Sequence, residues 1–419
     1  MLDLKLIRSD LPAVEEAMRR RGAEADLATL VELDERARAV RGHVETTRAE
    51  RTRIGKEVGA RRRAGEDTGG LEAEGRALGE RLTADEEALR ELEAERDAVL
   101  LGLPNIAQAE APPGGEDDAR EVRRVGELPA LANPRDHVDL ATAAGVLDLE
   151  SAARVSGARF AYLKGPLVRL QMAVVSLALD AVEEAGFTPV IPPVLVREEA
   201  MWGTGFFPTD RSSIYRTAED DLYLVGTSEV PLAGLHGDQI VAEDDLPLRY
   251  GGVSTCFRRE AGAAGKDTRG IFRVHQFDKV EMFSFVLPED SDEEHLRILG
   301  VQEAILRAIE VPYRVVDIAL GDLGASAARK FDCEAWMPAQ ERFREVTSCS
   351  NCTDYQARRL KCRVKRERGT VPVHTLNGTA VAVGRTLIAL LENHQNEDGS
   401  VTIPEALRAH GAPAAITPR

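Results

Sequence analysis

Residues 256–283 read CFRREAGAAGKDTRGIFRVHQFDKVEMF, a Gly/Ala-rich loop between two apolar segments. This pattern predicts two strands joined by a loop, with functional side chains carried inward. Arg258 and Glu260 stand two residues apart, which predicts that both lie on one face of a strand. Arginine binds phosphate through paired hydrogen bonds, so the segment indicates a phosphate site, whereas a basic surface loop is the alternative. Its cations are Arg258, Arg259, Lys266, Arg269 and Arg273.

Two further segments carry groups suited to a nucleotide. Residues 376–385 read LNGTAVAVGR, where two glycines allow close backbone approach before an arginine opens a helix. Residues 345–348 read EVTS, and an acid beside hydroxyls can hold Mg²⁺ against phosphate. Each segment alone is weak, because an ordinary strand end or helix cap looks the same. No GxxxxGK[ST] and no GxGxxG after a strand occurs, so arginines would have to hold the phosphates.

The composition is that of a folded protein. The 419 residues are 43% hydrophobic and 30% charged, which excludes a disordered chain. Charges interrupt the N-terminus, MLDLKLIRSDLP, so we expect no secretory signal there, and we expect no membrane span or membrane association. Five cysteines in a long chain do not suggest a disulfide framework. We therefore expect a cytoplasmic, reduced protein.

The N-terminal quarter carries a heptad-like pattern. Apolar residues recur at alternating spacings of three and four over 30–58 and again over 71–99, with Arg51 as a charged exception. The stretch between them includes AGEDTGG, a turn by composition. Two such helices predict an N-terminal helical domain over 1–102 with an antiparallel coiled-coil arm over about 27–100. An arm this thin cannot hold an active site, so we expect it to make contacts.

A basic run on the first arm helix stands out against a net charge of −17. Residues 46–63 hold seven Lys/Arg and two Glu. A solvated helix face is the alternative, but against the acidic background we favour contact with a polyanion. The residues expected to make it are Arg48, Arg53, Lys56, Arg61, Arg62 and Arg63.

The remainder of the chain predicts a linker and an α+β body. Residues 103–135 are rich in proline, glycine and acid, which is typical of a linker. Residues 136–419 mix helical periodicity with several β-like runs that are not arranged as regular βαβ units. We expect an antiparallel sheet flanked by helices, in a catalytic domain over 136–419.

Together these segments resemble class II aminoacyl-tRNA synthetases. GFTPVIPP at 186–193 looks like motif 1, FRRE at 257–260 matches motif 2, and Gly384-Arg385 ends motif 3. The strings VGTSEVPLAGLH (225–236) and EVTSCSNCTDYQARR (345–359), with the segment 256–282, are similar to bacterial and eukaryotic-type seryl-tRNA synthetases. The resemblance covers essentially the whole chain, including the N-terminal hairpin.

The resemblance implies a role for each matching position. The implied serine-binding residues are Thr227, Ser228, Glu229, Arg258, Glu281, Asn377 and Thr379. The implied ATP-binding residues are Arg258, Arg259, Glu260, Val274, Phe277, Glu345, Val346, Thr347, Ser348 and Arg385, with Glu345 also holding Mg²⁺ with ATP. Position 379 is Thr where many relatives have Ser, so the hydroxyl is kept.

The implied activity is activation of L-serine by ATP to seryl-adenylate, followed by transfer to tRNA(Ser) and, as is common in this family, tRNA(Sec). The implied assembly is a homodimer through 167–193. A carrier-protein ligase would lack the long arm, and a non-catalytic paralogue would have lost ATP-contacting residues, so we weigh both lower. Cys349 and Cys352 have CxxC spacing, but no second pair follows, so we expect no structural zinc.

Overall fold

The computed structural model describes residues 1–262, 265 and 267–419. Lys266 of the predicted phosphate site thus lies outside the described residues. By its internal contacts the chain divides into two compact units. One unit is Leu2–Leu103, and the other consists of Met1 and Pro104–Arg419.

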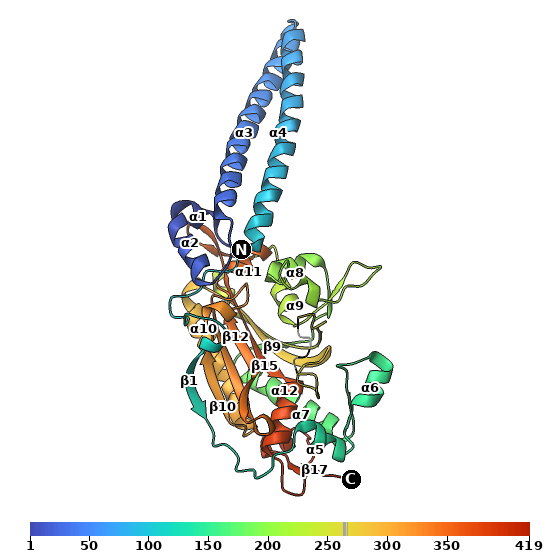
Figure 1. Cartoon of the computed structure of the whole chain (residues 1–419). Coiled ribbons are helices and arrows are strands. Elements are labelled where there is room, and N and C mark those ends of the chain that lie inside the picture. The colour runs from blue at the N-terminus through green and yellow to red at the C-terminus, as the bar shows by residue number, and fades with distance from the viewer. Residues whose placement is uncertain (263–264, 266) are drawn as a thin grey trace. The chain divides into compact units, whose positions relative to one another are not determined.

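The unit Leu2–Leu103 is a helical hairpin preceded by two short helices, α1 (Leu4–Ser9) and α2 (Leu11–Arg20). Its long helices, α3 (Leu27–Ala64) and α4 (Gly69–Gly102), lie side by side (Figure 1). Asp26 begins α3 by accepting a hydrogen bond from the Thr29 N–H at 3.0 Å. Gly65 ends it with φ 72°, a left-handed conformation that glycine adopts readily.

The predicted coiled coil is confirmed by the residues that the two helices bury. Leu30, Val44 and Ile54 of α3 and Leu82 of α4 are all buried along the seam. Arg96, at a seam position of α4, is also buried. Its guanidinium lies 2.7 Å from Asp97 and 3.8 Å from the buried Asp34 of α3, so opposite charge compensates its burial.

Arg51, the charged exception in the seam, remains exposed. A Cβ built on Gly79 of α4 would lie 3.6 Å from the Arg51 guanidinium. The missing side chain at Gly79 thus leaves room for a cation at this level of the hairpin.

The second unit is built on an eight-stranded sheet in the order β1-β10-β11-β12-β15-β9-β8-β4. The pairs are antiparallel except β4 with β8, which run parallel. The strand bounds, in sheet order, are Arg120–Val125, Tyr313–Asp317, Arg329–Met337, Arg342–Asn351, His374–Ala382, Gln276–Val286, Leu248–Phe257 and Thr188–Val190. The predicted antiparallel α+β body is therefore confirmed.

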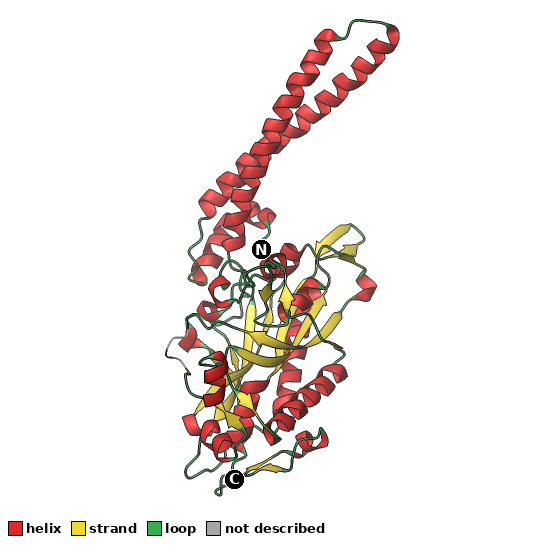
Figure 2. Cartoon of the chain, turned by 90° about the vertical axis from the view of Figure 1, so that its right-hand side faces the viewer, coloured by secondary structure: helices red, strands yellow, loops and turns green. Residues whose placement is uncertain are grey.

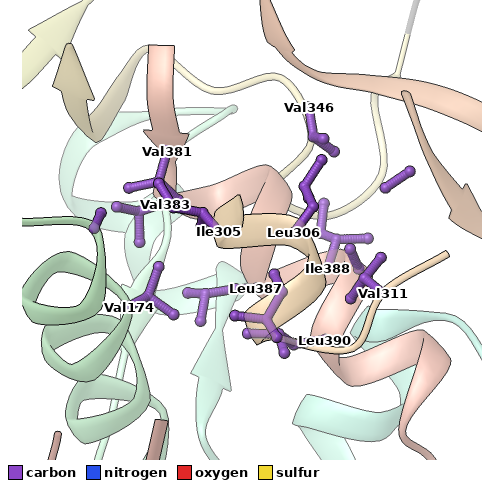
Figure 3. Packing of buried hydrophobic residues seen from close by; sticks show 14 of the residues in the cluster. Val174, Ile305, Leu306, Val311, Val346, Val381, Val383, Leu387, Ile388 and Leu390 are labelled. Carbon is purple, nitrogen blue, oxygen red and sulfur yellow. The ribbon is translucent and has the colours of Figure 1, made fainter. Parts of the chain in front are cut away.

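The helices α7 (Pro166–Glu184), α10 (Ser291–Ala308) and α12 (Val383–Asn393) pack against this sheet. Figure 2 shows red helices beside the yellow strands. Figure 3 shows their apolar side chains meeting those of the strands, among them Val174, Leu306, Val381 and Leu387. Val280 and Met282 of β9 belong to this core. Because side chains alternate along a strand, Lys279 and Glu281 point to the opposite face of the sheet.

Part of the segment expected as a linker belongs to the sheet. Residues 120–125 form β1 and pair with β10 from Arg120 opposite Asp317 to Val125 opposite Tyr313. Asn105 is buried, and its side-chain amide donates to the Ser326 and Cys352 carbonyls at 2.9 Å. The strand itself reads REVRRV, and its charged, exposed side chains suit a sheet edge as well as a linker, which explains the difference.

Shorter elements complete the second unit. No helix in the described residues is long and apolar enough to cross a membrane. The remaining helices are α5 (His137–Ala143), α6 (Leu149–Ser156), α8 (Glu198–Thr204), α9 (Glu229–Gly234), α11 (Tyr355–Leu360) and α13 (Glu405–Ala409). The remaining strands are β2 (Leu147–Asp148), β3 (Tyr162–Leu163), β5 (Leu195–Val196), β6 (Tyr223–Leu224), β7 (Ile240–Val241), β13 (Arg363–Arg366), β14 (Gly369–Pro372), β16 (Val401–Thr402) and β17 (Ala415–Ile416).

Candidate active site

The predicted hairpin of residues 256–283 is present as β8 and β9, which pair down to Phe257 opposite Gln276. The prediction that Arg258 and Glu260 share a strand face is wrong. The strand ends at Phe257, and Glu260 has φ 53° in the loop that follows. The Arg258 N–H donates to the His275 carbonyl at 2.9 Å, which closes the base of the loop.

A cavity of about 580 Å³, including its open mouth, lies beside this hairpin. The predicted residues that line it together are Arg258, Glu260, Val274, Phe277, Glu345, Val346, Thr379 and Arg385. It thus joins the loop after β8, strands β9, β12 and β15, and the start of α12. Arg273, one of the cations of the predicted phosphate segment, also lines it, as do five residues for which no binding role was predicted: Ile271, Phe272, Lys279, Ala382 and Gly384. Arg273 and Lys279 are cations inside quoted motifs, so their charge was a usable signal.

Two arginines that line the cavity are held against aromatic rings. The Arg258 guanidinium lies 5.3 Å from the Phe277 ring centroid, and its Nε donates to the Gly226 carbonyl at 3.1 Å. The Arg385 guanidinium lies 4.7 Å from the Phe272 ring centroid. Because these contacts fix the two charges in place, the cavity suits a ligand that carries several negative charges.

Glu345 is one of two acids that line this cavity, with Glu260, and its side chain keeps 44% exposure. Its carboxylate lies 3.0 Å from Arg385 Nη1. Burial acts to raise the pKa of Glu345, but the charges of Arg385 and Lys330 outweigh it and hold the pKa below its usual value. The carboxylate is therefore ionised at neutral pH.

Polar side chains from β9, β15 and the segment before α9 form a buried network beside the cavity. Lys279 Nζ donates to Thr227 Oγ1 at 2.7 Å and forms an ion pair with Glu281. The Thr379 hydroxyl donates to Glu281 Oε2 at 3.2 Å. The predicted serine-binding residues Thr227, Glu281 and Thr379 are thus linked in one network. The network also contains Lys279, for which no role was predicted.

Glu229 and Asn377 form a second part of this network. Glu229 Oε1 accepts from Asn377 Nδ2 at 2.9 Å and from Gln356 Nε2 at 2.7 Å. Burial, and then the negative charge of Glu281, raises the pKa of Glu229 to about 7. This carboxyl is therefore poised between its two protonation states near neutral pH. Gln356 was missed because an amide in a helix gives no sequence signal.

Comparisons with known proteins identify the family to which this chain belongs. The model described as seryl-tRNA synthetase N-terminal domain matches residues 1–107, and the tRNA synthetase class II core domain (G, H, P, S and T) matches residues 212–394. The serine–tRNA ligase of Acidothermus cellulolyticus is 48% identical over 421 residues, covering 100% of both chains. That of Mycobacterium avium is 50% identical and covers 97% of this chain and 96% of its own. The chain belongs to the seryl-tRNA synthetase family.

Solved seryl-tRNA synthetases share the fold over the full length. The enzyme of Pyrococcus horikoshii complexed with ATP has a TM-score of 0.92 and 42% identity, covering 100% of both chains. The cytoplasmic enzyme of Naegleria fowleri in complex with AMP has a TM-score of 0.88 and 35% identity, covering 100% of this chain and 99% of its own. The resemblance drawn from the motifs is therefore confirmed at the level of family and fold.

Besides the four network residues Thr227, Glu229, Glu281 and Asn377, four further predicted site residues do not line the cavity: Arg259, Ser228, Thr347 and Ser348. The Arg259 guanidinium lies 6.0 Å from the Tyr215 ring centroid, and its N–H donates to the Ser213 carbonyl. The Ser228 hydroxyl is buried and donates to the Gly252 carbonyl at 3.3 Å. Thr347 is buried and lies opposite Cys333 on the neighbouring strand β11, and Ser348 lies opposite Asp332 on the same strand. Ser228 and Thr347 are thus buried, whereas Arg259 is exposed.

The six cations predicted on the arm of this synthetase all lie on α3 with exposed side chains. Arg48 and Arg62 form ion pairs across the hairpin, with Glu86 at 2.6 Å and Glu72 at 2.7 Å. Arg53 and Arg61 contact Glu57, whereas Lys56 and Arg63 have no carboxylate within 4.0 Å among the described residues. Exposed pairs of this kind are weak, so the run is available to a polyanion.

The cysteines of this synthetase are all buried and unpaired. Asn377 Nδ2 lies 3.7 Å from Cys352 Sγ. Within the described residues no group of three or more His, Cys, Asp or Glu side chains could hold a metal ion. A Mg²⁺ site at Glu345 would therefore need ligands from the nucleotide itself, which is usual for Mg²⁺ bound with phosphates.

Proposed function

We propose that this chain activates L-serine with ATP and transfers the seryl group to the 3′ end of tRNA(Ser). One observation carries the proposal: a cavity between Arg258 and Arg385 adjoins the buried Thr227–Lys279–Glu281–Thr379 network. A polyphosphate and a small hydroxyl-bearing amino acid would meet there. The full-length identity to serine–tRNA ligases supports the same assignment.

In the first step, the serine carboxylate attacks the α-phosphorus of ATP, and the bond to pyrophosphate breaks. Arg258 would neutralise the charge on the α-phosphate and the carboxylate, and Arg385 that on the γ-phosphate. Phe277 and Val274 would hold adenine, with Glu260 on the adenosine side. No covalent enzyme intermediate is needed, because the gain comes from positioning and charge neutralisation.

Serine recognition would rest on the buried network. Thr227, Glu281 and Thr379 offer the hydroxyl and carboxylate oxygens that a serine ammonium and hydroxyl require, while Glu229 and Asn377 complete the pocket wall. Alanine lacks the hydroxyl and would leave buried polar groups unpaired, which disfavours it strongly. Arg259, Ser228 and Thr347 would then act by supporting the residues beside them.

Glu345 would supply the oxygen ligand that suits Mg²⁺, since its ionised carboxylate with 44% exposure stands beside the phosphate-binding Arg385. The ion would add positive charge to the phosphates of ATP when bound. In its absence the Glu345 carboxylate orients Arg385, whose Nη1 also donates to the Glu345 carbonyl at 3.0 Å.

In the second step, a hydroxyl of the terminal tRNA ribose attacks the adenylate carbonyl and AMP leaves. The arm residues Arg48, Arg53, Lys56, Arg61, Arg62 and Arg63 would bind the tRNA backbone. A tRNA(Sec) that presents the same backbone shape would also be accepted. The proposed assembly is a homodimer through residues 167–193. The proposed location is the reducing cytoplasm, because all five cysteines are unpaired.

The test is ATP–pyrophosphate exchange with each of the twenty amino acids, followed by charging of total tRNA. We expect exchange with serine alone and charging of serine tRNAs. Exchange with serine but transfer to a carrier protein instead of tRNA would identify the rival acceptor. Absence of exchange with any amino acid would refute the catalytic proposal.

A further inference from the structure

His137 lies between two parts of the candidate active site that are far apart in the sequence. It is the first residue of α5 and is 4% exposed. The Ile271 N–H, at the end of the loop after β8, donates to its Nε2 at 3.2 Å. A backbone N–H can only donate, so Nε2 carries the lone pair and the ring proton resides on Nδ1.

Glu392 of α12 fixes the orientation of this ring. Its side chain is fully buried, and its Oε1 accepts from His137 Nδ1 at 3.1 Å and from the His137 N–H at 3.2 Å. Its Oε2 accepts from the Ala339 N–H at 3.2 Å. A carboxylate held at three points leaves the imidazole one orientation, which directs Nε2 at Ile271.

Ile271 has a glycine close to it on each side, Gly270 in the chain and Gly384 in space, and a side chain at Gly270 would clash. A Cβ on Gly270, whose φ is 79°, would lie 2.0 Å from His137 Nε2. A Cβ on Gly384, at the start of α12, would lie 3.3 Å from the Ile271 carbonyl oxygen. Next to them, Arg269 forms ion pairs with Asp136 at 2.7 Å and Asp139 at 2.5 Å. The loop end is thus attached to the beginning of α5.

The residues that follow this attachment form the nucleotide side of the cavity. Residues 271–274 all line it, and the Phe272 ring lies under Arg385 at 4.7 Å and Arg344 at 3.9 Å. Any shift of the Ile271 backbone would move Phe272 and with it the support of Arg385. A displacement of 1 Å in a binding group can reduce activity about a hundredfold.

We propose that His137 is a positioning residue for ATP: through its hydrogen bonds to Ile271 and Glu392 it holds the end of the loop after β8 against α12. The inference rests on the proposed function for its kinetic readout. His137 touches neither the cavity nor a reacting atom, so its loss should affect ATP binding and leave serine binding nearly unchanged.

The experiment compares His137→Phe, which removes both hydrogen bonds, with His137→Gln, whose amide can accept from Ile271 and donate to Glu392. We expect H137F to raise the KM for ATP about tenfold in serine-dependent pyrophosphate exchange, with the KM for serine within about threefold of wild type. H137Q should stay within about threefold for both. His394→Phe is the matched control, because it removes a histidine contact to the Ile309 carbonyl (2.9 Å) away from the cavity.

Hydrogen-exchange mass spectrometry of the peptide 268–275 supplies a readout that does not depend on catalysis. Its amides should exchange faster in H137F than in wild type and H137Q, and H394F should leave them unchanged. If H137F does not fold, His137→Leu replaces it, because the smaller side chain fits the same space. Equal KM for ATP and equal exchange in H137F (or H137L) and H137Q would overturn the proposal. An inactive wild type would instead refute the proposed function and leave the exchange comparison valid.

Discussion

At the scale of single residues, Arg258 and Arg259 are neighbours with different surroundings. Arg258 lines the cavity, whereas Arg259 lies near Tyr215. Arg258→Ala should lower serine-dependent pyrophosphate exchange at least about a hundredfold, because it removes a fixed charge from the transition state. Arg259→Ala is the matched control and should stay within about fivefold. Melting temperatures of both variants show whether they fold. Equal losses in the two variants would show that the ATP-contacting arginine is misassigned.

Glu229 predicts a pH dependence of stability. The pKa of this buried carboxyl is raised to about 7 from its usual 4.5. Because the folded state holds the proton more tightly, the stabilisation is present below pH 4.5 and is lost as pH rises through 7. Glu229→Gln cannot ionise, so its melting temperature relative to wild type should rise from pH 5 to pH 8 without serine. Glu367→Gln, at an exposed site outside residues 167–193, serves as the control. A constant difference for Glu229→Gln would contradict the prediction.

Sequence patterns identified most lining residues but not their partners. Linear motifs alone identify Arg258, Phe277 and Arg385, because the order of residues along the chain is sufficient to recognise those motifs. Lys279 joins the serine network only because β9 places it beside Glu281, with Thr227 within 2.7 Å of its ammonium. Contacts of this kind depend on which strands pair, and strand pairing is set by tertiary packing rather than by local sequence.

At the scale of elements, α3 and α4 were predictable because a heptad pattern is local and repeats over many turns. Strand β1 could not be predicted, because an exposed edge strand lacks the alternation of apolar and polar residues that marks a half-buried strand. Its burial pattern has only Val125 partly covered. The paired partner Tyr313–Asp317 lies almost two hundred residues further on, and no local signal announces that contact.

The arm predicts that serine activation and tRNA charging can be separated. Deleting residues 35–95 and joining the ends with a short turn should leave pyrophosphate exchange nearly intact, because the cavity lies in the other unit. Charging should collapse, mainly through the KM for tRNA. Unchanged charging by the shortened protein would show that the arm does not select the acceptor.

A milder form of this experiment uses Lys56→Gln and Arg63→Gln together, since neither side chain has an ion pair to lose in the described part of the hairpin. The salt dependence of tRNA binding should flatten by up to about 0.9 in slope for each lost phosphate contact. Arg36→Gln, another exposed cation of α3, serves as control. Equal slopes in all three proteins would mean that the basic run touches no phosphate.

At the scale of the whole molecule, large apolar side chains remain exposed near α7 and β4. Ile191 is 88% exposed and Met172 is 53% exposed. Burying such residues against a second copy would stabilise a dimer by about 25 cal/mol for each Å² of apolar surface. Met172→Asp with Ile191→Asp should therefore sediment as a monomer at micromolar concentration, whereas wild type should sediment as a dimer. Leu296→Asp, at an exposed site on α10, should remain dimeric. A monomeric wild type with full charging activity would refute the homodimer.

The short strand β4 is the last strand of the sheet at this end, and its composition affects whether a further strand can pair there. It holds three residues at the edge beyond β8, and Pro189 within it has no N–H to offer a neighbouring strand. Pro192 and Pro193 follow at once. A three-residue edge strand whose central residue has no N–H is a poor template for an added strand, and it is through added strands that unprotected sheet edges lead to fibrils. Pro189 therefore limits strand pairing at this edge of the sheet, so two copies would meet there through side chains instead of by extending the sheet.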